Sequence, residues 1–335
     1  MECRQLGRTG IRVSTLCFGT MSFGDIADEA TSEVMYRRCR DAGINFFDCA
    51  NVYSAGRSEE ILGGLIAGER DQLVITSKVG FSMGEGPENQ GLSKRHVLAS
   101  VDASLKRLGT DRLDILFLHR FDSETPIEET LRALGELVRQ GKVLHTGASN
   151  WAAWQIATGL GVSTLHDLPA FACIQPMYSL AKRQAEVEIL PLAVAEGLGV
   201  ITYSPLGGGL LTGKYAVGQR PDSGRLMENK MYQARYREDA YYELAERLTA
   251  FAQERNVHPV TLAVAWVAKH SAVTAPIIGA RNVEQLKPSL AAADFTMDDE
   301  LYAEISALSP TPPPATDRTD EQAGLAYKGS EERYR

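Results

Sequence analysis

Four residues that can hold or move a proton stand out in this sequence of 335 residues: Asp48, Tyr53, Lys78 and His119. Each one lies at or just past the end of a short apolar run that the pattern predicts to be a β-strand. In folds that alternate strands and helices, catalytic groups and ligands collect at the carboxyl ends of successive strands. We therefore expect these four side chains to form an active site.

The elements that would position them repeat along the chain. Short apolar or β-branched runs alternate with helical patterns from about residue 16 to about residue 294, without a Ser/Gly/Pro linker long enough to mark a domain boundary. The predicted strands span residues 15–18, 44–47, 73–76, 113–118, 143–146, 171–174, 200–203 and 275–278. This layout predicts an α/β fold, a (β/α)8 TIM barrel, that forms a single domain over residues 1–309.

Three further features are expected around the barrel. Residues 3–6 and 11–13 flank a turn bounded by glycines, which predicts an N-terminal β-hairpin that closes one barrel mouth. Long loops after strands 3 and 7, at 80–92 and from 206 to about 239, would rise on the catalytic face. The segment 310–335 is a Pro-rich and charged C-terminal tail, and either draping over the barrel or mobility fits its composition.

The composition limits the class of partner. The net charge of -8 and the lack of a clustered basic stretch argue against nucleic acid or an anionic membrane surface, which leaves a small soluble ligand. No apolar run approaches the roughly 18 residues of a membrane span, and the first residues lack the order of a signal peptide, so we expect a cytoplasmic protein. Cysteines and histidines lack metal-ligand or disulfide spacing, so no metal site is expected. The sequence does not indicate an oligomeric state.

Four segments resemble the aldo-keto reductase family, and the resemblance covers nearly the whole chain. The segments are 43–53, 75–78, 113–120 and 147–151, in the family's order and each at a predicted strand end. Cys49 stands where the family usually has Thr, a departure that should not touch the chemistry. The segment 119–122 and the long loop after strand 7 resemble the bacterial-type branch, which reduces sugars and aldehydes.

The resemblance implies reduction of an aldehyde or ketone, in which a hydride is added to carbon and a proton to oxygen. Tyr53 would be the general acid. Lys78 would lower the Tyr53 pKa from its ordinary value near 10, because an ammonium within about 4 to 6 Å favours the phenolate. Asp48 would keep Lys78 charged and oriented, and His119 would hydrogen-bond and orient the carbonyl oxygen.

The resemblance also implies a nicotinamide cofactor, although no Gly-x-Gly-x-x-Gly follows the first predicted strand. Ser149, Asn150 and Gln175 match the positions that hydrogen-bond the nicotinamide carboxamide, and Tyr203 matches the aromatic residue on which the ring stacks. The other expected cofactor contacts are Thr20, Met21, Asp48, Ser204, Leu206, Gly208, Lys214, Gly279, Arg281 and Gln285. Within this set, the Gly-rich stretch 204–214 could wrap a pyrophosphate.

Arg281 favours NADPH over NADH, because its planar guanidinium suits the 2′-phosphate and it opens a predicted helix whose amides favour an anion. The family commonly continues with a Glu-Asn pair that holds adenine. This chain has Pro288 and Ser289 there, which leaves the adenine contacts open.

Aromatic residues near the predicted strand ends and a cation beside His119 predict a mouth with aromatic walls and one positive charge. The aromatic residues are Phe23, Phe81 and Trp151. The expected substrate contacts are Phe23, Tyr53, His119 and Arg120. Such a mouth suits small aldehydes, phosphorylated or carboxylated ones included. An ion pair between Arg120 and Asp122 is the alternative role for that arginine.

Two other functions stay open. Some proteins with this fold bind nicotinamide tightly, turn over slowly and attach to membrane channels, so a low-turnover regulatory subunit of channel-associated type is one alternative. The other is a barrel lyase in which Lys78 forms a Schiff base. The cofactor motifs argue against the lyase.

Overall fold

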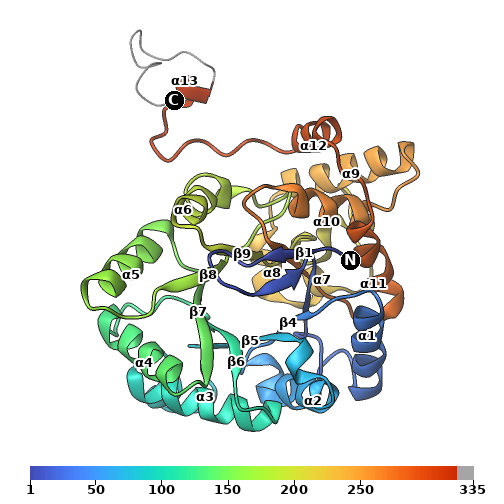
Figure 1. The fold of residues 1–335 in the computed structure, drawn as a ribbon. Helices are drawn as coiled ribbons and strands as arrows, with labels where there is room; N and C mark the ends of the chain where they lie inside the picture. Colours follow the sequence, from blue (N-terminus) through green and yellow to red (C-terminus); the bar gives the residue numbers. More distant parts are fainter. Residues whose placement is uncertain (323–335) are drawn as a thin grey trace.

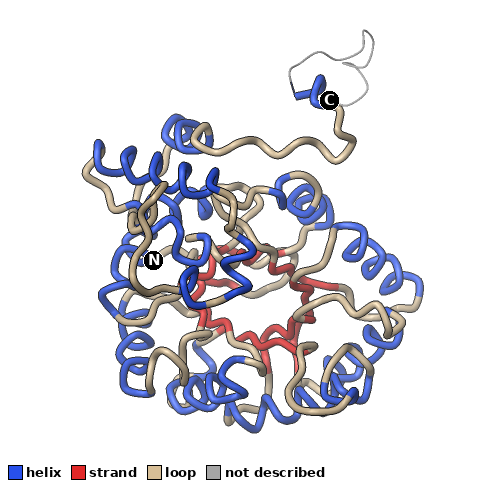
Figure 2. Tube along the Cα trace, turned by 180° about the vertical axis from the view of Figure 1, so that it is seen from behind, coloured by secondary structure: helices blue, strands red, loops and turns tan. Residues whose placement is uncertain are grey.

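The computed structural model describes residues 1–322. Within that span, eight parallel strands close a barrel in the order β10, β3, β4, β5, β6, β7, β8, β9. Helices between the strands surround the barrel in Figure 1, and Figure 2 shows the strands as an inner ring within them. The predicted (β/α)8 TIM barrel is therefore confirmed.

The observed strands overlap every predicted strand. The barrel strands are β3 (Cys17–Gly19), β4 (Phe46–Asp48), β5 (Val74–Val79), β6 (Leu113–Leu118), β7 (Val143–Ser149), β8 (Phe171–Gln175), β9 (Gly199–Thr202) and β10 (Ala275–Ile278). The helices are α1 (Glu29–Asp41), α2 (Arg57–Ile66), α3 (Lys94–Leu108), α4 (Ile127–Arg139), α5 (Ala153–Leu165), α6 (Ile189–Glu196), α7 (Arg225–Glu228), α8 (Lys230–Arg235), α9 (Asp239–Glu254), α10 (Pro259–Lys269), α11 (Val283–Leu290), α12 (Asp299–Ser306) and α13 (Thr319–Gln322). Because β5 and β7 run past their predicted ends, Lys78 and Ser149 lie inside strands rather than after them.

The N-terminal hairpin closes one end of the barrel. Strand β1 (Cys3–Gln5) pairs antiparallel with β2 (Arg12–Ser14), which confirms the predicted hairpin. Leu6 and Val13 are fully buried in a cluster with inward-facing residues of the barrel strands. A Cβ at Gly199 would lie 2.4 Å from Leu6 Cδ1, so the close fit of this plug requires glycine there. The plug seals the barrel at the amino ends of its strands.

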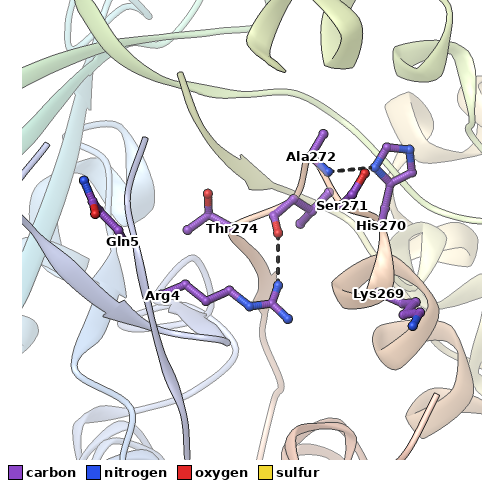
Figure 3. Close-up of a pocket in the computed structure, with 8 residues that line it drawn as sticks. Arg4, Gln5, Lys269, His270, Ser271, Ala272 and Thr274 are labelled. Carbon is purple, nitrogen blue, oxygen red and sulfur yellow. Dashed lines mark hydrogen bonds between the residues drawn. The ribbon is translucent and has the colours of Figure 1, made fainter. Parts of the chain in front are cut away.

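Arg4 ties this hairpin to the last part of the barrel. Its Nη1 donates hydrogen bonds of 3.1 Å to the carbonyls of Ala268 and Val273, the second of which is drawn in Figure 3. A hollow of about 260 Å³ beside it is lined by Arg4, Gln5 and residues 269–274. This hollow lies at the amino end of β10, whereas the candidate catalytic residues lie at the carboxyl ends of their strands.

Strand alternation places an apolar layer beneath a polar one. Inward-facing members of the sealed cluster include Phe46, Phe117, Cys173 and Ile201. The residues two positions later are Asp48, His119, Gln175 and Tyr203. Because residues i and i+2 of a strand face the same side, these polar side chains stand on what we call the apolar floor, the buried cluster that contains Leu6 and Val13.

The two long loops and the tail complete the chain. Residues 80–93 connect β5 to α3, and the connection from β9 to α9 contains a 3-10 helix, η5 (Gly207–Thr212), together with α7 and α8. After α12 the chain runs from 307 to 318 without helix or strand and extends away from the barrel in Figures 1 and 2. Part of the expected tail, 323–335, lies outside the described residues. None of the described helices is long and apolar enough to cross a membrane.

Candidate active site

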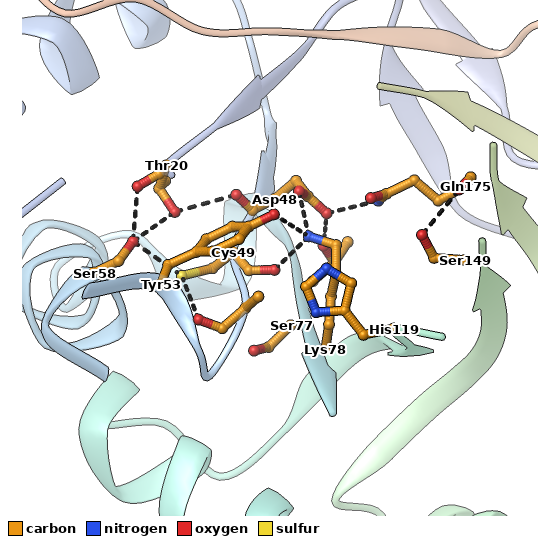
Figure 4. Close-up of polar contacts among 12 residues, drawn as sticks. Thr20, Asp48, Cys49, Tyr53, Ser58, Ser77, Lys78, His119, Ser149 and Gln175 are labelled. Carbon is orange, nitrogen blue, oxygen red and sulfur yellow. Dashed lines mark hydrogen bonds and ion pairs between the residues drawn. The ribbon is translucent and has the colours of Figure 1, made fainter. Parts of the chain in front are cut away.

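Lys78 is the centre of a buried hydrogen-bond network (Figure 4). The residue is 1% exposed, and its Nζ donates to Asp48 Oδ2 at 2.5 Å, to the Cys49 carbonyl at 2.7 Å and to Tyr53 OH at 3.2 Å. An ammonium has three N–H donors, so these acceptors occupy all of them. Because Lys78 is the donor to Tyr53, the proton of the Tyr53 hydroxyl is not used in this bond.

Asp48 is held from both sides of the barrel. Its Oδ1 accepts hydrogen bonds from Thr76 Oγ1 at 2.7 Å and from Gln175 Nε2 at 2.8 Å. Thr76 is the register partner of Asp48 across β4 and β5, whereas Gln175 comes from β8, on the opposite side of the ring. A buried carboxylate without partners would cost several kcal/mol. Here two donors and the Lys78 ammonium offset that cost.

Burial and charge act in opposite directions on the network. Burial lowers the pKa of Lys78, but the Asp48 carboxylate and Tyr53 raise it by more, so the pKa lies above its ordinary value. Burial raises the pKa of Tyr53 to about 12, because it outweighs the lowering by Lys78. Lys78 thus lowers the Tyr53 pKa, as the sequence predicts, but burial, which the sequence does not show, raises it by more. Tyr53 is protonated at neutral pH.

His119 is a neutral group beside Tyr53. Burial and, secondly, the charge of Lys78 hold the His119 pKa well below its ordinary value. The centroid of its ring lies 6.0 Å from that of Tyr53 and 4.6 Å from that of Phe81. Among the described residues, His119 Nδ1 has no hydrogen-bond partner. A neutral imidazole can donate from one ring nitrogen and accept at the other, so this ring can orient a polar group.

The residues expected to hold a carboxamide join the same network. Ser149 Oγ donates to the Gln175 carbonyl at 2.9 Å, and Asn150 Nδ2 donates to Ser149 Oγ at 3.1 Å and to the His119 carbonyl at 2.8 Å. Tyr203 OH donates to Asn150 Oδ1 at 2.6 Å. Asn150 has a positive φ of 61°, a conformation that costs of order 1–3 kcal/mol and gathers at functional sites. The structure thus brings these residues together with the Lys78 network.

The other expected cofactor residues follow three strands, in the loops after β3 and β9 and in the loop and first turn of α11 after β10. After β3, Thr20 is buried and its Oγ1 donates to the Asp48 carbonyl at 3.1 Å, while Met21 is exposed. The residues on the loop after β9 are Ser204, Leu206, Gly208 and Lys214, and those after β10 are Gly279, Arg281 and Gln285. A Cβ at Gly208, which has φ +71°, would lie 2.5 Å from Tyr232 Cδ1, so this loop requires glycine.

Arg281 links two of these loops. Its Nη2 lies 3.4 Å from Glu228 Oε2 of α7. Asn282 caps α11 by accepting from the Gln285 backbone N–H at 3.0 Å. Inside α11, the Pro288 carbonyl accepts from Thr261 Oγ1 at 2.7 Å, and the Ser289 hydroxyl is buried. Neither Pro288 nor Ser289 therefore presents a polar side-chain group to solvent.

The remaining expected contacts have different surroundings. The Phe23 side chain is fully buried against Phe18, so it packs in the core rather than at the mouth. Cys49 Sγ lies 3.3 Å from Ser58 Oγ, and the Lys78 ammonium bonds the Cys49 carbonyl rather than this sulfur. The alternative ion pair between Arg120 and Asp122 is not formed within residues 1–322.

The sequence pattern did not predict two residues that support the network. Thr76 faces the same side of β5 as Lys78, because it lies two positions earlier, and that spacing is the signal that could have found it. Glu59 is fully buried behind β5, where it accepts from Ser77 Oγ at 2.5 Å and from Arg107 Nε at 2.7 Å. Since Ser77 adjoins Lys78, this contact holds the strand from outside. In the described part of the chain, no group of three or more His, Cys, Asp or Glu side chains could hold a metal ion.

Comparisons with known proteins identify relatives along nearly the whole chain. A family model described as "Aldo/keto reductase family" matches residues 15–310. The chain is 39% identical over 301 residues to a "Probable voltage-gated potassium channel subunit beta" of Arabidopsis thaliana, covering 88% of this chain and 92% of the relative. It is 37% identical over 327 residues to "Uncharacterized oxidoreductase YrpG" of Bacillus subtilis, covering 93% and 97%. It is 34% identical over 318 residues to the "L-glyceraldehyde 3-phosphate reductase" of Escherichia coli O157:H7, covering 91% of each.

Proposed function

Because this chain belongs to the aldo/keto reductase family, we propose that it reduces an aldehyde or ketone to an alcohol, with NADPH as the hydride donor. The observation that carries the proposal is the bond from Lys78 Nζ to Tyr53 OH, at 3.2 Å, within a network that Asp48 completes. Relatives named as a reductase and an oxidoreductase support the same class of reaction. Small and sugar-type carbonyl compounds are the proposed substrates.

Tyr53 is the proposed general acid. Its pKa of about 12 keeps it protonated at neutral pH, and its proton is not committed to Lys78, which is itself the donor in their hydrogen bond. As negative charge develops on the carbonyl oxygen, Tyr53 transfers that proton, and the Lys78 ammonium stabilises the phenolate that remains. Asp48 keeps the ammonium in place. General acid catalysis of this kind contributes typically about 10²- to 10⁴-fold in rate.

His119 has a different role in this proposal. Because its pKa is lowered, His119 is a neutral imidazole at neutral pH. It therefore does not act as a second acid, as a charged imidazolium could. It hydrogen-bonds the carbonyl oxygen and holds it towards Tyr53, whose ring lies beside it.

The chain's own groups fit a nicotinamide dinucleotide. Gln175 uses one side-chain N–H on Asp48, which leaves its second N–H and its Oε1 to hold a carboxamide. Both N–H groups of Asn150 are already used, but its Oδ1 can accept a second hydrogen bond beside the one from Tyr203. At the far end, the Gly-rich loop after β9 suits a pyrophosphate and Arg281 suits a 2′-phosphate. The bound cofactor would supply the hydride. Because Pro288 and Ser289 offer no exposed polar side-chain group, Arg281 and Gln285 would hold the adenosine end.

Replacement of Tyr53 by phenylalanine tests the acid. We expect turnover, followed as NADPH oxidation with a panel of aldehydes and ketones, to fall by about two to four orders of magnitude. The Kd for NADPH, measured by fluorescence, should stay close to that of the wild type. Normal turnover in Tyr53→Phe would refute the role of Tyr53, and a matching loss of NADPH binding would assign the residue to cofactor binding instead.

The relative named as a probable voltage-gated potassium channel subunit beta favours a second candidate function, a nicotinamide-binding regulatory subunit with low turnover. The same measurement on the wild type separates the two. Tight retention of NADPH with negligible turnover on every carbonyl compound would favour the regulatory subunit. The raised pKa of Lys78 argues against a Schiff-base lyase, because the amine must lose its proton before it attacks a carbonyl.

A further inference from the structure

Arg120 is an exposed cation at the catalytic mouth without an ionic partner among residues 1–322. It directly follows His119, at the carboxyl end of β6. The nearby carboxylate of Asp122 is committed elsewhere: it accepts from the Leu92 backbone N–H and from Thr125 Oγ1, each at 2.7 Å. These bonds outweigh burial and lower the Asp122 pKa. Asp122 therefore anchors the end of the loop after β5 and leaves Arg120 unpaired.

Phe81 connects this cation to the candidate catalytic residues. Arg120 Cζ lies 5.4 Å from the centroid of the Phe81 ring, within the range of a cation–π contact. The same ring lies 4.6 Å from the ring of His119, edge to face. We call Phe81 and Arg120 the ledge. The distance from the Arg120 guanidinium to the His119 ring is therefore at most the sum of these two distances. A substrate with a few bonds between its carbonyl and a second polar group suits this separation.

The backbone around Phe81 fixes the ledge in place. Gly80 has φ +130°, and the Gly91 N–H donates to its carbonyl at 3.1 Å, so the two ends of the loop meet beside β6. A Cβ at Gly80 would lie 3.1 Å from Leu92 Cδ2, which leaves little room for a side chain. Phe81, the next residue, is thereby held against the end of β6.

Arg120 is also placed away from the groups expected to bind the cofactor phosphates. Arg281 follows β10, and β10 lies opposite β6 in the order of strands around the barrel. Two cations thus stand on opposite sides of the Lys78 network. Arg281 belongs to the side with the Gly-rich loop, whereas Arg120 belongs to the side with Phe81 and His119.

We propose that the ledge is a subsite for an anionic group of the substrate, a carboxylate or a phosphate carried a few bonds from the carbonyl. This inference rests on the proposed function, because it requires the carbonyl to lie at Tyr53 and His119. Arg120 binds the anion, since its planar fork matches carboxylate and phosphate oxygens, and Phe81 packs against the connecting atoms. The preferred substrates are therefore carboxylated or phosphorylated aldehydes rather than neutral ones.

Matched pairs of aldehydes test the subsite. Wild-type kcat/KM is measured for 4-carboxybenzaldehyde and for its neutral methyl ester, and in a second arm for glycolaldehyde phosphate and glycolaldehyde. The ester keeps the ring and an electron-withdrawing group, so the ratio of the two kcat/KM values reports the charge. We expect a ratio of about tenfold in favour of the anion, the effect of one charge-assisted hydrogen bond. The arm with the larger ratio identifies the anion.

Variants of Arg120 locate the effect. In Arg120→Gln the ratio should fall to near one, and Arg120→Lys should restore part of it, because lysine keeps the charge but not the fork. Arg37→Gln, which removes a 71% exposed arginine side chain on α1, is the matched control and should keep the wild-type ratio. An unchanged ratio in Arg120→Gln, or a wild-type ratio near one in both arms, would overturn the subsite alone. Lack of turnover on all four aldehydes would overturn the proposed function together with the subsite.

Discussion

Replacing Thr76 with valine would remove one hydrogen bond from the buried Asp48 carboxylate and keep the β-branched shape of the side chain. The bond is 2.7 Å long, and Thr76 and Asp48 are 0% and 2% exposed. A hydrogen bond to a charged group contributes about 1.5–3 kcal/mol, compared with about 0.5–1.5 kcal/mol for a neutral pair. We expect Thr76→Val to lower the free energy of unfolding by about 1.5–3 kcal/mol.

Urea denaturation at neutral pH measures this free energy. The control is a background in which Asp48→Asn and Lys78→Met remove both charges of the ion pair together, which avoids leaving one buried charge alone. In that background the same valine should cost about 0.5–1.5 kcal/mol, because the bond that Thr76 donates to the introduced amide would be neutral. Equal costs in the two backgrounds would refute the reasoning that the charge of Asp48 makes the Thr76 bond strong.

Two further predictions concern His119 and Glu228. Below about pH 6.5, His119 takes up a proton in the unfolded chain but not in the folded chain, where its pKa is lowered. The free energy of unfolding therefore decreases as the pH is lowered. At pH 5.5 the free energy of unfolding of the wild type should have decreased by about 1.4 kcal/mol more than that of His119→Asn. The same pH dependence of this free energy in both proteins, measured by urea denaturation, would contradict the prediction. Glu228→Gln removes the carboxylate, 3.4 Å from Arg281, that a 2′-phosphate must replace. The Kd for NADPH should fall by up to about fivefold, and an equal fall for NADH would contradict the phosphate role.

The positions of the polar residues at strand ends could be predicted from the sequence. Asp48 and His119 each follow an apolar run, and the alternation of side chains along a strand decides which residues face the barrel interior. The same rule applies to Lys78, although it lies inside β5 rather than beyond it. The structure places all three on the apolar floor, within one network or beside it. Local pattern was sufficient here because strand direction and alternation are local properties.

Other features depend on packing between distant segments. The net pKa of Tyr53 could not be predicted, because the sequence shows the lysine that lowers it but not the depth of burial that raises it. Within residues 1–322, Arg120 has no ionic partner because Asp122 bonds the backbone of Leu92, a contact across 30 residues. The spacing from Lys78 places Thr76 on the same face of β5, but its bond to Asp48 depends on the register between β4 and β5, which the sequence does not show.

The N-terminal hairpin closes the barrel at one end, so the barrel interior is open at one end rather than at both. Leu6 and Val13 close its base, and the buried cluster to which they belong, which includes Phe46, Phe117 and Ile201, is apolar. Under the proposed reaction, Tyr53 must then recover its proton through the mouth, the same opening by which the alcohol departs. Departure of the product and recovery of the proton would therefore share one opening.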